Sequence, residues 1–305
     1  MSDALLNKQV SRRKVLALTG GLGILAASPA SAGFEFLASD SAKELLGGAM
    51  SLAKTYFNKE ESEIQIGTQY FEPYLKQSGG LYPDRTAQEA LAKFSEPIIA
   101  TSKRKKLPWE IRLVQSDQVN AWALPGGKMA VNSKLLHYVD HPSALGSVIA
   151  HEVGHAELSH GIKQMRSKTF MKAAGSAGKM VLEHYLGGGG GLTDEIYKAL
   201  EGPLFGLVTA GYSRTHEFEA DQHIISVFTK TGLDPMRSAD FFKTLLKIYP
   251  SSSKQTTSLF STHPGTVDRI TELEKAGRKV ETRTVKPTDP PGWAELKEKF
   301  PTINV

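Results

Sequence analysis

Residues 147–161 read SVIAHEVGHAELSHG and place three histidines and two glutamates in an otherwise apolar stretch. His151 and His155 are four residues apart, so on a helix both imidazoles project from one face and could bind one metal ion together. Glu152 lies about 100° around the helix from His151, where it can reach a water at that ion without being a ligand. The preceding PSALGSVIA, residues 142–150, favours a helix start. Two histidines at this spacing also occur by chance on exposed helices, so a third ligand decides between the two interpretations.

The best candidate for a third ligand lies in SRTHEFEADQH, residues 213–223. Catalytic zinc takes three protein ligands and an open position. Because the chain has no cysteine, those ligands must be His, Asp or Glu. Glu217 and Asp221 are four residues apart and share a helix face, whereas Glu219 points away from that face. Glu217 as a ligand would therefore come with Asp221, a carboxylate that can accept the free ring N–H of a metal-bound histidine.

The combination of HEVGH, SRTHEFEAD and STHPGTVDRI resembles metallopeptidase family 48, which includes HtpX, the periplasmic BepA-like proteases and the CAAX prenyl proteases. NAWALPGGKMAV and KTGLDP extend the resemblance over residues 65–275. It implies a zinc endopeptidase with one zinc ion per chain, His151, His155 and Glu217 as ligands, and Glu152 as general base. His263, in THP, lies where exported relatives carry a histidine near the zinc. It either stabilises the oxyanion or, with its loop, caps the metal and keeps the enzyme inactive.

Two further parts of the site have open alternatives. Asp221 is expected to support a ligand histidine, and Arg214 to pair with a carboxylate near the site; either could instead be a solvated surface group. The strand edge before the turn LPGG could accept an extended substrate through main-chain hydrogen bonds, although a plain tight turn explains the glycines equally well. The candidate substrate-binding residues on this edge are Ala123, Leu124, Gly126 and Gly127.

The other histidines near the motifs are expected to be structural. On a continuous helix His160 would lie about 7.5 Å beyond His155 along the axis, which is too far to join the same ion. His216 and His223 do not share the face of Glu217.

The chain pattern predicts an α+β fold, mainly helical, with a small sheet beside the HExxH helix. Apolar residues recur at helical intervals over 41–104, WEIRLVQS (109–116) alternates like a strand, and residues 119–132 form two extended pieces around 125–127. Helical patterns return after Pro142, and the helix carrying Glu217 is expected to begin near Thr193 or after Pro203. We expect one metallopeptidase domain over 33–285, whose helical segment 33–64 could be regulatory, and a proline-rich C-terminal tail over 286–305.

Residues 1–32 have the features of an export signal. SRRK (11–14) precedes a short apolar run, and Ala30-Ser31-Ala32 offers a small-residue cleavage site. The arginine pair resembles a twin-arginine signal, with the Sec route and an uncleaved anchor as open alternatives. The apolar run is too short to span a membrane. We therefore expect an exported, periplasmic protein of the soluble branch rather than a membrane-embedded prenyl protease.

Charge and composition restrict the classes of partner. Of the 37 basic and 32 acidic side chains, four and one respectively lie in the first fourteen residues, so the remainder is nearly neutral and predicts no nucleic-acid partner. We expect protein or peptide substrates, namely exported or misfolded envelope proteins, and partners at the membrane periphery or in outer-membrane assembly. The alternative is a latent protease that acts mainly as a chaperone-like or assembly factor.

Overall fold

A three-stranded mixed sheet lies at the centre of the computed structural model, which describes residues 60–165, 211–249, 262–263, 266–280 and 289–305. The strand order is β1-β3-β2: β1 (Glu110–Val114) runs parallel to β3 (Lys128–Asn132), and β2 (Ala121–Leu124) runs antiparallel to β3. A 3-10 turn, η2 (Pro125–Gly127), joins β2 to β3. These elements confirm the predicted strand and the two extended pieces around the Pro-Gly-Gly turn.

Helices make up most of the rest, which confirms the predicted α+β class with a small sheet. All described residues fall in one unit, Ala53–Val305. The predicted export signal, the glycine run 187–191 and most of the loop 249–265 lie outside the described residues. The remaining helical elements are α4 (Glu60–Gln77), α5 (Arg85–Ile99), α6 (Ser133–Leu136), α7 (Pro142–Glu157), α8 (His160–Met165), α11 (Arg214–Thr231), η3 (Pro235–Arg237), α12 (Asp240–Ile248), α14 (Thr266–Lys279) and α15 (Trp293–Lys299).

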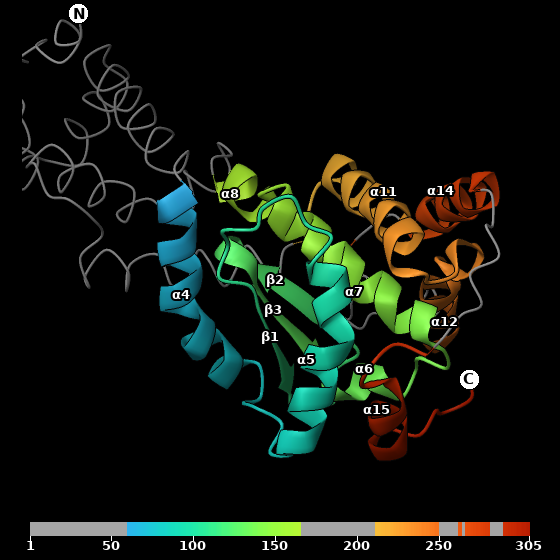
Figure 1. The fold of residues 1–305 in the computed structure, drawn as a ribbon, viewed down its shortest axis with the longest axis horizontal. Helices are drawn as coiled ribbons and strands as arrows, with labels where there is room; N and C mark the ends of the chain where they lie inside the picture. Colours follow the sequence, from blue (N-terminus) through green and yellow to red (C-terminus); the bar gives the residue numbers. More distant parts are fainter. Residues whose placement is uncertain (1–59, 166–210, 250–261, 264–265, 281–288) are drawn as a thin grey trace, which may run out of the picture. The chain divides into compact units, whose positions relative to one another are not determined.

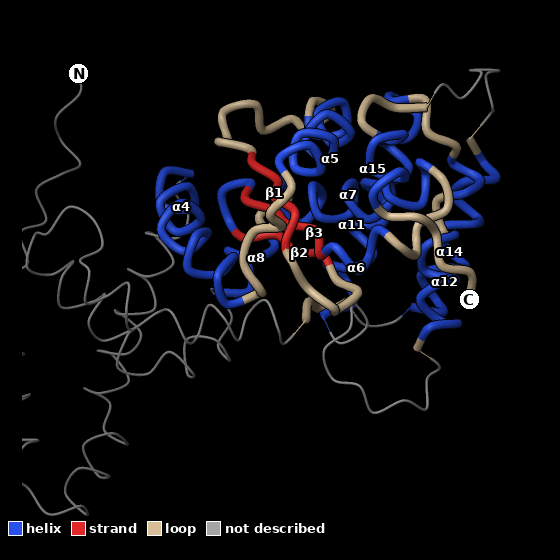
Figure 2. Tube along the Cα trace, turned by 90° about the horizontal axis from the view of Figure 1, so that it is seen from below, coloured by secondary structure: helices blue, strands red, loops and turns tan. Residues whose placement is uncertain are grey.

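The sheet is covered on both faces. Figures 1 and 2 show α4 on one side of it and α5 and α7 on the other. Trp122 of β2 packs edge-on against Phe71 and Tyr74 of α4, whereas Ala123 belongs to the core shared with α5 and α7. Because helices cover both faces, every residue of β2 and β3 is buried, in contrast to the half-buried pattern of β1.

Helix α7 runs through the core and carries the HEVGH motif. Pro142 occupies its first turn, and His141 caps it by accepting the Ala144 N–H through Nδ1 at 3.2 Å. Residues 143–156 are all buried, so the motif lies inside the protein rather than on an exposed helix face. This burial argues against the chance interpretation of the two histidines.

Helix α11 starts at the later of the two places that the sequence pattern indicates. It begins at Arg214, which lies after Pro203 and well beyond Thr193, because Gly211 takes a positive φ of 79° and Ser213 caps the first turn by accepting the His216 N–H. It ends at Gly232, which adopts the left-handed conformation with a φ of 77°.

The C-terminal segment set apart as a tail contributes to the core. Trp293, Leu296 and Phe300 are buried against α5 and its surroundings, and the Lys297 ammonium donates to the carbonyls of Leu136 and Val139.

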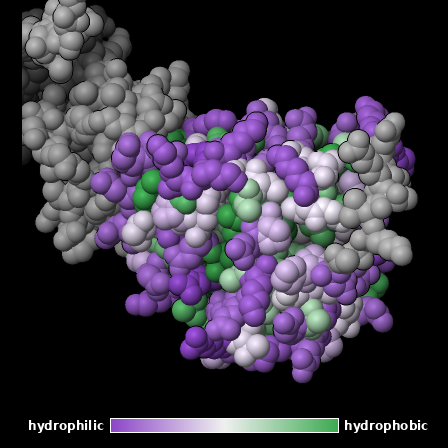
Figure 3. Space-filling model, in the orientation of Figure 1, coloured by the Kyte–Doolittle hydropathy of each residue, from purple (hydrophilic) through white to green (hydrophobic). Residues whose placement is uncertain are grey.

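Among the described helices, none is both long enough and apolar enough to cross a membrane. The face in Figure 3 is largely hydrophilic, with hydrophobic side chains showing only in small areas.

Candidate metal centre

Four buried side chains converge where α7, α11 and residues 262–263 meet. His151, His155, Glu217 and His263 each offer one donor atom, and these atoms all lie within 4.8 Å of one another. The Nε2 atoms of His151 and His155 are 2.9 Å apart, and Glu217 oxygens lie 3.5 and 3.4 Å from them respectively. His263 Nδ1 is 3.1 Å from Glu217 Oε1. The structure therefore brings together the three residues predicted as ligands, and adds His263 to them.

The donor atoms have the spacing of a zinc site. Zinc lies about 2.0 Å from its nitrogen and oxygen ligands, so the ligand atoms of a tetrahedral site are roughly 3.3 Å apart. The distances from His151 and His155 to Glu217 are close to that value. Imidazole and carboxylate donors are also the ligand types that zinc takes in the absence of thiolates. The residues present thus fit the metal.

Close packing of α7 on α11 sets the distance between these ligands. Gly154 faces Ala220, and a Cβ at Gly154 would lie 3.1 Å from the Ala220 Cα and 3.0 Å from the His223 Cβ. The absence of a side chain therefore allows the two helix backbones to approach closely at the position next to His155.

Asp221 lies where the helical spacing indicates, against the outer nitrogen of His151. Its Oδ1 is 3.0 Å from His151 Nδ1, so the inner Nε2 is left to face the other donors. Arg269 of α14 closes the same group: its guanidinium donates to both Asp221 oxygens at 2.7 and 2.8 Å and lies 2.6 Å from Glu217. Arg269 also stacks over Phe242 and is only 1% exposed.

Arg214, the arginine expected at the site, is exposed on the first turn of α11, and the structure does not bring it to the cluster. Arg269 takes that place, and the sequence analysis assigned it no role. It lies in the quoted segment VDRI, six residues after His263, but that spacing alone does not point to a carboxylate on another helix.

Glu152 lies beside the donor group, and its carboxylate accepts no hydrogen bond from the described residues. Both oxygens are buried, and neither has a hydrogen-bond partner among the described residues; the nearest basic atom, His263 Nε2, is 3.5 Å from Oε1. A buried carboxylate without a partner is rare in a folded protein and costs free energy unless a ligand or water satisfies it. Its position fits a group that exchanges protons with a bound water or substrate.

Burial and neighbouring charges shift the pKa values in the cluster in opposite directions. Burial raises the pKa of Glu152 and lowers that of His155 well below the ordinary value. Burial also acts on Glu217, but His263 and hydrogen bonds from the histidines outweigh it and hold the Glu217 pKa far below its usual range. For His151, burial and the Arg269 charge lower the pKa, but hydrogen bonds to Asp221 and Glu217 outweigh them and raise it to about 9.

His160 is not part of the donor group, as expected, but it contacts the outer nitrogen of the donor His155. Its Nδ1 lies 2.9 Å from Nδ1 of His155, and its Nε2 lies 2.9 Å from Glu219. Burial lowers the His160 pKa to about 4, so the ring is neutral at pH 7. The ring stacks on His216 with a centroid distance of 4.3 Å.

Helix α4 packs against the turn of the candidate substrate edge. Gly126 has a φ of 77° and donates its N–H to Glu63 at 3.4 Å, and a Cβ at Gly126 would lie 2.9 Å from the Glu63 carbonyl oxygen. Glu63 itself pairs with Arg104 at 2.9 Å. The candidate residues of this edge, Ala123, Leu124, Gly126 and Gly127, are all buried.

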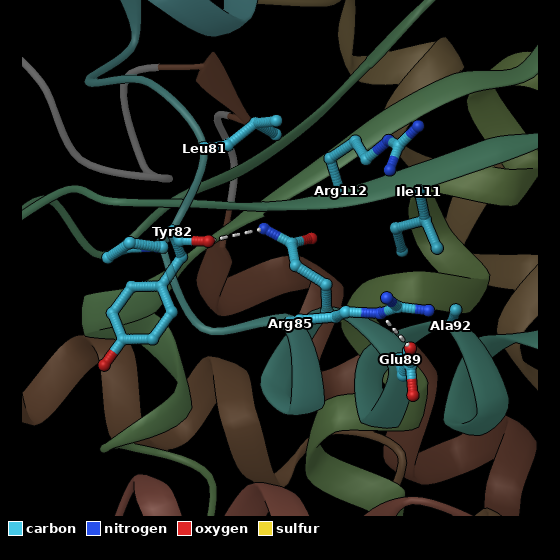
Figure 4. Close-up of a pocket in the computed structure, with 9 residues that line it drawn as sticks. Leu81, Tyr82, Arg85, Glu89, Ala92, Ile111 and Arg112 are labelled. Atoms are coloured by element: carbon cyan, nitrogen blue, oxygen red, sulfur yellow. Dashed lines mark hydrogen bonds and ion pairs between the residues drawn. The ribbon is translucent and has the colours of Figure 1, made fainter.

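A separate cavity of about 490 Å³ lies between α5, the loop before it and β1, and no residue of the metal cluster lines it. Figure 4 shows Arg85 paired with Glu89 on α5, opposite Ile111 and Arg112 of β1. Arg112 in turn pairs with Glu110. These paired surface charges offer no set of groups for catalysis or metal binding.

Comparison with known proteins agrees with this geometry. Residues 85–277, well over half of the chain, match the family described as Peptidase family M48. The chain is 26% identical over 233 residues to the beta-barrel assembly-enhancing protease of Escherichia coli (strain K12), covering 74% of this chain and 46% of that protein.

Two shorter matches have other names. The chain is 27% identical over 167 residues to metalloprotease YcaL of Escherichia coli (strain K12), covering 54% of this chain and 61% of that protein. It is 26% identical over 193 residues to mitochondrial metalloendopeptidase OMA1 of Arabidopsis thaliana, covering 63% of this chain and 36% of that protein. The chain spans about half the length of the first curated relatives it matches.

Proposed function

The chain belongs to peptidase family M48, and from that premise we propose that it is a zinc-dependent endopeptidase acting on exported or misfolded envelope proteins. The observation that carries the proposal is the buried group of His151, His155 and Glu217 beside the Glu152 carboxylate, which accepts no hydrogen bond from the described residues. Residues 33–285 would form the metallopeptidase domain, with the export signal before it and the C-terminal segment 286–305 after it.

In this proposal His151, His155 and Glu217 hold one zinc ion. When bound, the zinc would act as a Lewis acid that polarises the scissile carbonyl and lowers the pKa of a water. Asp221 orients His151 by accepting its Nδ1–H, and Arg269 fixes Asp221 and balances the carboxylate charges.

Glu152 is the proposed general base. It accepts the proton of the water that attacks the peptide carbonyl and then donates it to the leaving nitrogen. Its buried oxygens are free for both transfers, because no described side chain donates a hydrogen bond to them. His263 Nε2, 3.5 Å away, is placed to stabilise charge on the substrate oxygen.

The outer edge of β2 is the proposed substrate edge. In the antiparallel pairing with β3, Trp122 lies opposite Ala130, and the Asn120 carbonyl accepts the Asn132 N–H. Because pairing alternates along a strand, the main-chain groups of Ala123 point away from β3. The described residues provide no partner for them, so an extended peptide could pair there with little dependence on sequence.

A second candidate function is a latent protease that acts mainly as a chaperone-like or assembly factor. The observation that favours it is His263, whose Nδ1 lies within the donor group and could fill the position that substrate needs. Replacing His263 by Ala separates the two functions. Latency requires that His263→Ala gain cleavage of casein, whereas a constitutively active enzyme cleaves before the substitution and gains nothing.

The central test is Glu152→Gln, which keeps the size of the side chain and removes the base. We expect the variant to retain one zinc per chain by elemental analysis and to lose casein cleavage by at least a hundredfold, the lower range for removal of a general base. Glu157→Gln, at the end of the same helix, is the matched control and should cleave normally. Cleavage by Glu152→Gln at the wild-type rate would refute the proposed mechanism.

We further propose export to the periplasm and partners in outer-membrane assembly. The support is the arginine pair at residues 12 and 13 and the name of the Escherichia coli relative, beta-barrel assembly-enhancing protease. Substitution of Arg12 and Arg13 together by Lys should block export through the twin-arginine route. Cell fractionation measures export, and normal export of the double variant would exclude this route.

A further inference from the structure

We infer that His160 and Glu219 form a hydrogen-bond chain that fixes the tautomer of His155 and thereby sets the affinity of the centre for zinc. The inference rests on the proposed function, because it takes His155 as a zinc ligand. It assigns a positioning role to both residues. The sequence analysis expected His160 to be structural and Glu219 to point away from the face of Glu217.

The chain begins at the surface and ends in the metal cluster. Glu219, on the first half of α11, has a side chain 43% exposed, and its Oε2 lies 2.9 Å from Nε2 of His160. His160 is completely buried, and its Nδ1 lies 2.9 Å from Nδ1 of His155. The other nitrogen of His155, Nε2, faces His151 and Glu217.

For neutral imidazole rings, donor and acceptor rules leave one arrangement of protons in this hydrogen-bond chain. An ionised carboxylate can only accept, so the proton of His160 must be on Nε2, where it points at Glu219. The bare Nδ1 of His160 can then only accept, so the proton of His155 must be on Nδ1. This leaves the lone pair of His155 Nε2 directed at the donor group, the form in which an imidazole binds a metal.

The two ligand histidines are thus supported in different ways. The outer nitrogen of His151 meets a carboxylate directly, the Asp221 that Arg269 holds in the interior. The outer nitrogen of His155 meets a carboxylate only through a second imidazole, and that carboxylate is at the surface. A surface substitution at Glu219 should therefore change the zinc affinity of a fully buried site.

The test is zinc binding by the metal-free full chain, measured by competition with a chromophoric chelator. His160→Phe removes both hydrogen bonds while keeping an aromatic ring stacked on His216, and we expect about 10–100-fold weaker zinc binding, the range for loss of such partners. His160→Asn keeps an acceptor near His155 and should bind zinc more tightly than His160→Phe. His216→Phe is the matched control and should bind zinc as the wild type does.

Glu219→Met tests the outer end without touching the interior. We expect about tenfold weaker zinc binding, and no further loss when it is combined with His160→Phe, because the link is already broken there. Glu272→Met, an exposed glutamate of α14, should have no effect. Wild-type zinc affinity in Glu219→Met, or equal losses in Glu272→Met, would overturn the inference.

Two further measurements separate this inference from its alternatives. If His160 only packs, His160→Phe lowers the melting temperature of the metal-free protein but leaves zinc affinity unchanged, which overturns the inference. Side-chain nitrogen NMR should report His160 with its proton on Nε2 in the wild-type protein. Failure of the wild type to bind zinc one to one would instead refute the proposed function itself, so the two failures are distinguishable.

Discussion

Replacing Arg269 by Met should cost the metal-free protein about 3–5 kcal/mol of unfolding free energy, the range for removing one partner of a buried ion pair. Arg269 makes two short bonds to Asp221 and lies 2.6 Å from Glu217, and all three side chains are buried. Methionine keeps much of the contact with Phe242 but removes the charge. Two buried carboxylates would then lose their shared cation, and the loss follows from that uncompensated charge rather than from packing.

Urea unfolding after removal of metal by a chelator measures this loss. At about 2–4 °C per kcal/mol for a domain of this size, the same change corresponds to a fall in melting temperature of roughly 6–20 °C. The matched control is Arg214→Met, which changes the same side chain at an exposed helix position and should stay within about 0.5 kcal/mol of wild type. A loss below about 1 kcal/mol in Arg269→Met would refute the role of Arg269 as the cation of the cluster.

Two other substitutions test the packing of the turn before β3 and of the C-terminal segment. Gly126→Ala should lower the unfolding free energy by about 2–4 kcal/mol, because it combines a left-handed φ with a Cβ 2.9 Å from the Glu63 carbonyl oxygen. The control Gly80→Ala has a similar φ but open space around it, so it should lower the unfolding free energy by only about 1–2 kcal/mol in the same urea assay. Phe300→Ala should lower the unfolding free energy by about 3–5 kcal/mol, because Phe300 is a buried aromatic residue of the C-terminal segment. Its control Ile303→Ala changes an exposed side chain and should be nearly neutral. Equal losses within either pair would contradict the packing described.

Local spacing was enough to predict the parts of the site that lie on single helices. The four-residue intervals from His151 to His155 and from Glu217 to Asp221 place side chains on common faces, and the structure brings all four together. The sheet and the mainly helical class followed from the change between alternating and helical periods. These features depend on neighbours a few residues apart, which is the range over which sequence periodicity is informative.

Contacts made by tertiary packing could not be predicted in this way. Arg269 reaches Asp221 across 48 residues of sequence, through the packing of α14 on α11, and no local spacing encodes that approach. His160 was placed on a straight continuation of the catalytic helix. The helix ends at Glu157 instead, and Ser159 adopts a φ of 53°, which turns His160 back toward His155.

Gly154 gives the motif a sensitivity to mutation that its ligands alone do not explain. The residue binds nothing, yet its missing side chain lets α7 and α11 approach at Ala220, beside His155 on one helix and one turn after Glu217 on the other. A Cβ there would lie 3.0 Å from the His223 Cβ and 3.1 Å from the Ala220 Cα, so a larger residue would push apart two helices that each carry ligands and lengthen the distances from His151 and His155 to Glu217. One of the two positions between the histidines that look free to vary is thus restricted by the geometry of a neighbouring helix, and substitutions at it should weaken zinc binding although the residue is not a ligand.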